Sequence, residues 1–108
     1  MFIDCINLLE VNIPSNVKII DWRAFRNCDS ITKIEIPSSV ETIEDEAFGR
    51  MAGLRYVYIP SSVKKVGKDV FEGSPDLVIH CEDPTKKKGW STQFARYVLN
   101  PIQWGSEK

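Results

Sequence analysis

The stretch Ile31–Gly53, which reads ITKIEIPSSVETIEDEAFGRMAG, decides the fold because its pattern returns every 23 residues. The tripeptide Ile36-Pro37-Ser38 also occurs one interval earlier and one interval later. The other repeated positions are Phe2, Phe25, Phe48 and Phe71; Leu8, Ile31, Leu54 and Leu77; Val17, Val40 and Val63; and Ile20, Ile43 and Val66. A fixed period of this length predicts a solenoid of stacked coils. A solenoid usually offers an extended binding surface and seldom a catalytic pocket.

Within one coil, the apolar residues first follow the two-residue period of a strand and then enter a tight turn. Ile34 and Ile36 alternate with polar residues and predict a short strand with one buried face. Pro37 ends this strand because proline has no N–H to donate to a sheet. Val40–Ile43 predicts a second short extended segment, and Asp45–Phe48 predicts a helical or 3₁₀ turn. Since each coil runs the same way, the strands are expected to be parallel.

The pattern changes near the C-terminus. The segment Leu77–Cys81 has one residue fewer between its inward positions, and we expect the period to stop after it. Beyond it, aromatic and aliphatic residues have the spacing of one helix face, and Pro101 would end such a helix. These residues are Trp90, Phe94, Tyr97 and Val98. We therefore predict a mainly β solenoid of about four coils over residues 1–81 and a helix-containing cap over residues 82–108. A last short strand is expected near Trp104, whose side chain would pack with the cap aromatics.

The opposite end shows no cap. The first coil is incomplete and would expose Phe2, Leu8, Val11 and Ile13 on an open edge. Unpaired edges invite self-association, so we expect a homo-oligomer formed through this end. The chain begins inside a repeat, as expected for a piece of a longer array or for a short gene product. Trp22 is expected to point outward, where it would cover the open end or contact a partner.

Composition excludes several classes of partner. The 108 residues carry a formal net charge of −1, which gives no reason to expect binding to nucleic acid. The run Lys86-Lys87-Lys88 is the single basic cluster, and we interpret it as a solvated loop because three lysines fall short of a polybasic motif. No stretch approaches the roughly 20 apolar residues of a membrane span, so insertion into a membrane is not expected.

Motifs for catalysis, metals or cofactors are not found in the sequence. Cys5 and Cys28 lie one period apart and suggest reduced cysteines in a buried column, with a disulfide between adjacent coils as the alternative. His80 and Cys81 are adjacent in a strand, so they face opposite sides and cannot form a catalytic dyad. Cys-x-x-Cys spacing, glycine-rich phosphate loops and nucleophile elbows do not occur. We therefore expect no enzyme activity, no cofactor and no metal.

The outward positions of the strands form the candidate binding surface. Tyr56 and Tyr58 would lie together on it, beside basic side chains, and tyrosine and arginine are enriched at interface hot spots. The candidate protein-binding residues are Lys33, Glu35, Arg55, Tyr56, Tyr58 and His80. The alternative interpretation is that aromatic residues simply suit exposed strand positions and stabilise their cross-strand neighbours.

The unit from Cys28 to Phe48 resembles the BspA-like class of leucine-rich repeats, found in surface proteins of bacteria and of some protozoan parasites. It reads Cys-x-x-Ile-x-x-Ile-x-Ile-Pro-Ser-Ser-Val-x-x-Ile-x-x-x-Ala-Phe, and the resemblance covers residues 2 to about 81. The resemblance implies a right-handed solenoid with one strand per repeat on the concave side. The family often has glycine after the Val-x-x-Ile step. Gly67 fits this pattern, whereas Asp21 and Glu44 depart from it.

The resemblance also carries the functional expectation. It implies a non-catalytic module for protein–protein interaction and adhesion in a cell-surface or secreted protein. Its partner would be a protein, such as a host matrix or cell-surface protein. One alternative is a structural spacer or self-assembling unit whose faces bind its own copies, and another is an intracellular interaction scaffold.

Overall fold

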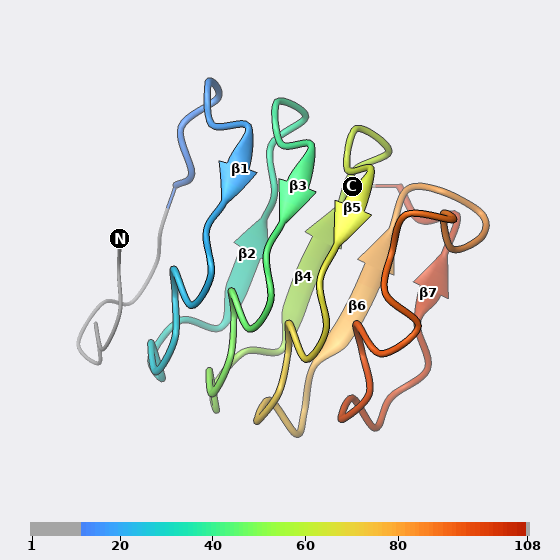
Figure 1. Ribbon diagram of the computed structural model, residues 1–108. Coiled ribbons are helices and arrows are strands. Elements are labelled where there is room, and N and C mark those ends of the chain that lie inside the picture. The colour runs from blue at the N-terminus through green and yellow to red at the C-terminus, as the bar shows by residue number, and fades with distance from the viewer. Residues whose placement is uncertain (1–11, 108) are drawn as a thin grey trace.

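The computed structural model describes residues 12–107, which form coils stacked side by side along one axis (Figure 1). Each coil contributes short strands to two parallel sheets on opposite sides of the core. The first sheet contains, in order, β1 (Ile19–Ile20), β3 (Thr42–Ile43) and β5 (Lys65–Val66). The second contains, in order, β2 (Lys33–Glu35), β4 (Tyr56–Ile59), β6 (Val78–Cys81) and β7 (Gln103–Trp104).

Strand pairing follows the sequence period. Ile20 pairs with Ile43, and Ile43 pairs with Val66, so each step along the first sheet is one 23-residue repeat. Tyr56 pairs with Val78, one residue less than a full repeat, which confirms the shortening expected in this coil. The predicted mainly β parallel solenoid is therefore confirmed.

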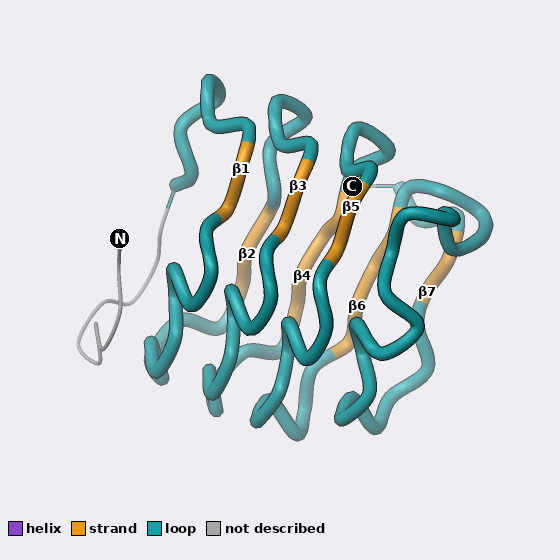
Figure 2. The backbone as a smooth tube through the Cα atoms, viewed as in Figure 1, coloured by secondary structure: helices purple, strands orange, loops and turns teal. Residues whose placement is uncertain are grey.

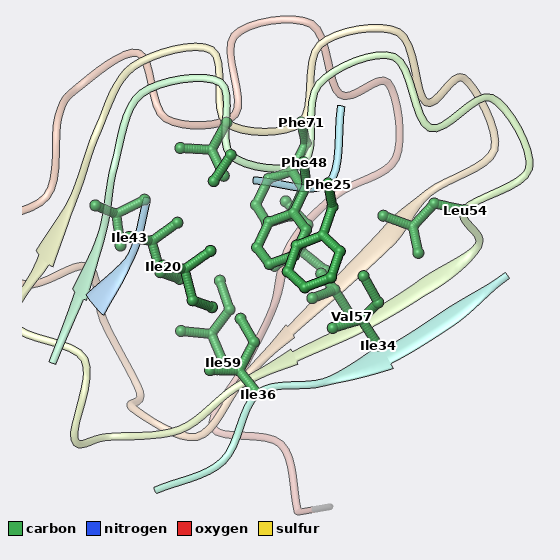
Figure 3. Close-up of a cluster of buried hydrophobic side chains, with 14 of the residues drawn as sticks. Ile20, Phe25, Ile34, Ile36, Ile43, Phe48, Leu54, Val57, Ile59 and Phe71 are labelled. Carbon is green, nitrogen blue, oxygen red and sulfur yellow. The ribbon is translucent and has the colours of Figure 1, made fainter. Parts of the chain in front are cut away.

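The core consists of columns in which each coil places the same side chain over the next. The rings of Phe25 and Phe48 stack at 5.3 Å between centroids and 9° between planes. The rings of Phe48 and Phe71 stack at 5.6 Å and 4°. Ile20 and Ile43 form a neighbouring aliphatic column beside these rings (Figure 3). Because every ring has a ring above or below it, no coil buries its phenylalanine alone.

Serine side chains join successive coils at the polar edge of these columns. The Ser39 hydroxyl donates to the Val17 carbonyl at 2.6 Å, and the Ser62 hydroxyl donates to the Val40 carbonyl at 2.8 Å. These bonds recur one repeat apart because each serine lies two residues after the proline that ends a strand. They satisfy carbonyl groups that the short strands leave outside the sheets.

The prediction of a C-terminal helix is wrong. Residues 12–107 contain strands, turns and loops but no helix, as the tube in Figure 2 shows. Over residues 92–97 the chain forms tight turns, with the Phe94 amide donating to the Ser91 carbonyl and the Val98 amide to Ala95. The earlier coils contain the same type of bond, in which an amide donates to the carbonyl three residues before it. One example is the bond from the Ala47 amide to the Glu44 carbonyl.

The tail after β6 adds another coil to the stack instead of a helical cap. Val66 forms a parallel bridge with Trp90, and the Ser91 amide donates to the Val66 carbonyl at 2.8 Å. Phe94 lies 23 residues after Phe71 and is buried, so the period continues beyond the point where we expected it to stop. The prediction that 1–81 and 82–108 are separate parts remains untested.

The aromatic packing expected of the tail is present in part. Trp90 and Phe94 are buried and meet edge to face, with ring centroids 5.1 Å apart. Trp104 lies against Trp90 at 5.9 Å. Tyr97 differs from the prediction because it is 51% exposed, with the Arg96 guanidinium 4.9 Å from its ring centre. Because residues 92–97 form turns and not a helix, the helical spacing does not hold there, and the Tyr97 side chain points to solvent.

Candidate protein-binding face

The candidate site is the outward side of β2, β4 and β6, hereafter the strand face, formed by Lys33, Glu35, Tyr56, Tyr58 and His80. Strand alternation places these side chains on one side because each strand contributes residues two apart. Parallel pairing then sets two rows across the strands. One row is Lys33, Tyr56 and Val78, and the other is Glu35, Tyr58, His80 and Gln103.

Tyr56 is the centre of the contacts on the strand face. Its ring centre lies 4.7 Å from the His80 ring at a tilt of 32°. The Lys33 ammonium lies 5.2 Å from the same ring centre, within the range of a cation–π contact. Lys33 also lies 3.8 Å from a Glu35 carboxylate oxygen. The structure thus joins Lys33, Glu35, Tyr56 and His80 in one connected surface cluster around a half-buried ring.

Tyr58 points outward as predicted but is not exposed, which corrects the expectation of two exposed tyrosines. Only 5% of the Tyr58 surface is accessible to solvent. Glu35 and His80 lie directly opposite on the two flanking strands, and the tail residues Ser106 and Glu107 border the same hollow as Tyr58. Burial, followed by the nearby Glu82 carboxylate, raises the pKa of Tyr58. Tyr58 therefore offers little area to a large partner.

Arg55 does not join the cluster through any contact found within residues 12–107. It is exposed and lies immediately before β4, where its backbone amide donates to the Thr32 carbonyl at 2.8 Å. Arg55 precedes β4, so the strand alternation that places Tyr56 on the strand face does not place the Arg55 side chain there. The predicted grouping of Arg55 with the tyrosines has no contact to support it.

His80 and Cys81 occupy the positions that strand alternation predicted. His80 stacks on Tyr56 at the surface, whereas Cys81 is fully buried in the core. Burial, with a smaller effect from Asp83, raises the pKa of Cys81 to about 12, so its thiol stays protonated near neutral pH. Cys28 is buried as well. The suggested Cys5–Cys28 disulfide involves Cys5, which lies outside the described residues.

Clusters of metal-ligating side chains and membrane-spanning helices are both absent from the described residues. No group of three or more His, Cys, Asp or Glu side chains in residues 12–107 is placed to hold a metal ion. None of these residues forms a helix of the length and hydropathy that crossing a bilayer requires.

The lysine run of the tail attaches its loop to the solenoid. Lys87 forms an ion pair with Asp83 at 3.2 Å and also donates to the Ser61 carbonyl. Lys86 donates to the Trp90 carbonyl at 3.1 Å. Two of the three ammonium groups are therefore engaged with the protein itself, which weakens any interpretation of this run as a surface for polyanions.

A shallow apolar hollow of about 150 Å³ lies at the N-terminal end of the described coils. Ile13, Val17, Ile20 and Phe25 contribute to its wall. Nearby, Ile19 is 52% exposed and Trp22 is 53% exposed, which confirms that Trp22 points outward. The remaining apolar residues expected at this edge, Phe2, Leu8 and Val11, lie outside the described residues.

The comparison with protein families matches the model described as "BspA type Leucine rich repeat region (6 copies)" to residues 1–81. The chain belongs to this family. Comparisons with curated proteins and with solved structures gave no match. BspA-type leucine-rich repeats are generally non-enzymatic, are often involved in binding, and are generally associated with surface or secreted proteins.

The contribution of the tail to the surface near Tyr58 was not predicted from the sequence. Glu82 and Glu107 border the hollow beside this tyrosine. The signal was present in the period, because Gln103 follows His80 by 23 residues and so continues its row. Extending the repeat through the tail would have placed Glu107 just beyond the end of the last strand.

Proposed function

We propose that this BspA-type repeat chain is a non-catalytic protein-binding module that serves adhesion in a surface or secreted protein. The observation that carries the proposal is the cluster on the strand face, in which the Tyr56 ring contacts Lys33 and His80. Tyrosine adds contact area at low entropic cost, and a ring held between neighbours has little freedom to lose on binding. The parallel sheet beneath supplies a rigid support.

The charge of this face favours a protein partner over other classes. Lys33 and Glu35 place opposite charges beside Tyr56, so the face has no single sign to attract a polyanion. Protein interfaces are enriched in aromatic residues and have a polar rim, and Tyr56 with polar neighbours fits this description. Host matrix and cell-surface proteins are the partners that the family association suggests.

The first test is binding of the purified chain to a panel of extracellular-matrix and plasma proteins. A Tyr56→Ser variant is compared with the wild type and with Tyr97→Ser, which removes an exposed tyrosine outside the strand face. We expect Tyr56→Ser to weaken binding by about 2 kcal/mol or more, the scale of an interface hot spot. Tyr97→Ser should bind like the wild type, and circular dichroism should be unchanged in both variants.

If both variants lose the same binding affinity, or if neither change affects saturable binding, the interface does not lie on the strand face. No binding to any member of the panel would favour the second candidate, a self-assembling structural unit. The observation behind that candidate is the apolar hollow at the N-terminal end, next to the exposed Ile19 and Trp22.

A further inference from the structure

A second hollow, of about 580 Å³, opens beside the strand face where β2 and β4 end. Its apolar wall comes from Ile36, Pro60 and the side of Tyr58. Its polar wall includes Glu82, which follows β6, and Glu107 in the tail. The hollow therefore exists because the tail forms a coil beside β6, a feature that the repeat pattern of residues 1–81 does not contain.

The charge of this hollow is negative. Both charged side chains that line it are carboxylates, and no lysine, arginine or histidine of residues 12–107 lines it. The Ser61 amide donates to a Glu82 carboxylate oxygen at 2.7 Å. Hydrogen bonding from Ser61 lowers the pKa of Glu82, so this carboxylate is ionised at neutral pH. Lys87 lies nearby but is paired with Asp83.

The Tyr58 hydroxyl supplies an independent observation. Tyr58 is more than nine-tenths buried and lines the hollow, and its hydroxyl makes no hydrogen bond with another described residue. Among the described residues the buried side-chain polar atoms without a hydrogen-bond partner are on Arg23 and Asp83, so the Tyr58 hydroxyl oxygen itself reaches solvent, and a ligand in the hollow can bond to it in place of water. The hollow thus combines a hydroxyl that can accept a hydrogen bond, two carboxylates and a small apolar wall.

We propose that this hollow binds the side chain of an arginine that a partner protein inserts. A guanidinium has five N–H donors in a fixed plane, which suits several acceptors at different positions of one pocket. Its weak hydration suits a hollow whose wall is partly apolar, with Ile36, Pro60 and the edge of Tyr58 beside the carboxylates. The site deepens the proposed function and rests on it, since it states the chemistry of the partner residue next to the strand face.

The experiment titrates the ¹⁵N-labelled chain with the peptide acetyl-Gly-Arg-Gly-amide and follows backbone amide shifts. We expect saturable shifts at Gly105 and Ser106, which line the hollow. The matched peptides with lysine or glutamate in the centre should bind at least several-fold more weakly. The double variant Glu82→Gln/Glu107→Gln should weaken arginine binding about tenfold or more. Glu41→Gln, an exposed glutamate before β3, should have no effect.

Other results overturn the proposal. Equal shifts with the glutamate peptide, or equal binding by the double variant and the wild type, would show that the hollow does not select a cation. Equal binding of the lysine peptide would overturn the assignment to a guanidinium. The Glu82→Gln change keeps a side-chain oxygen that can accept from the Ser61 amide, so the fold should persist. Unchanged Gly105 and Ser106 shifts in the free variant check this point.

The two proposals fail separately. Peptide binding at Gly105 and Ser106 without binding to any matrix or plasma protein supports the arginine site and counts against adhesion. Binding to a protein of the panel that depends on Tyr56 but not on Glu82 and Glu107 supports adhesion and overturns the arginine site.

Discussion

At the scale of single residues, a buried side chain in this chain is held mainly by its equivalents in the next coils. Phe48 shows this clearly, because its ring lies between Phe25 and Phe71 at 5.3 and 5.6 Å. A residue at the middle of a column loses contacts on both sides when it is truncated. The effect of a substitution should therefore depend on its place in the column.

The first prediction concerns Phe48→Ala. We expect it to lower the free energy of unfolding by about 3–5 kcal/mol, because it removes a large buried ring and leaves a cavity between two others. Urea denaturation followed by circular dichroism measures the change. Leu99→Ala is the control, since Leu99 is 80% exposed and should shift stability by less than about 0.5 kcal/mol. A Phe48→Ala effect as small as the control would contradict the column as the source of stability.

At the scale of elements, the strands are too short to be stable alone, with two to four residues each. Their stability comes from pairing with the equivalent strand one repeat away. β6 is paired on both sides, with β4 and β7. The tail therefore protects a strand edge that would otherwise remain open.

The second prediction follows from this pairing. Truncation after Pro101 removes β7 and the contacts of Trp104 with Trp90 and Phe94. We expect a loss of about 2 kcal/mol or more in unfolding free energy, together with aggregation through the exposed edge of β6. Urea denaturation and light scattering give the two readouts. A truncated chain as stable and as monodisperse as the full chain would show that β7 does not protect this edge.

At the scale of the whole molecule, the two ends of the stack differ. The C-terminal end is covered by the coil that contains Trp90 and Trp104. The N-terminal end of the described coils carries the apolar hollow, which Ile19 lines, and Trp22 is exposed as well. Apolar surface at one end favours pairing of that end with a second copy.

The third prediction is self-association through this end. We expect the mass measured by light scattering after size exclusion to rise with protein concentration. Ile19→Lys should shift the chain toward the monomer, because it places a charge on the exposed apolar edge. Leu99→Lys adds the same charge at an exposed leucine outside this end and should leave the mass unchanged. A constant monomer mass at high concentration argues against association.

The sequence by itself determined the solenoid, its parallel strands and the side chains that form each column. It could do so because a strict repeat places identical residues in identical surroundings, so one coil predicts the next. The same logic located Tyr56, Lys33 and His80 on one face.

The tertiary structure decided the rest. The spacing of Trp90, Phe94 and Tyr97 fits one face of a helix and also fits another coil, and only the pairing of Trp90 with Val66 selected the coil. The hollow beside Tyr58 is likewise lined by tail residues far away in the sequence. The local sequence shows which residues are apolar and how they are spaced, and this spacing is compatible with more than one backbone shape. The free energy of packing on the preceding coil then determines the backbone shape, because that is where the buried area and the hydrogen bonds are gained.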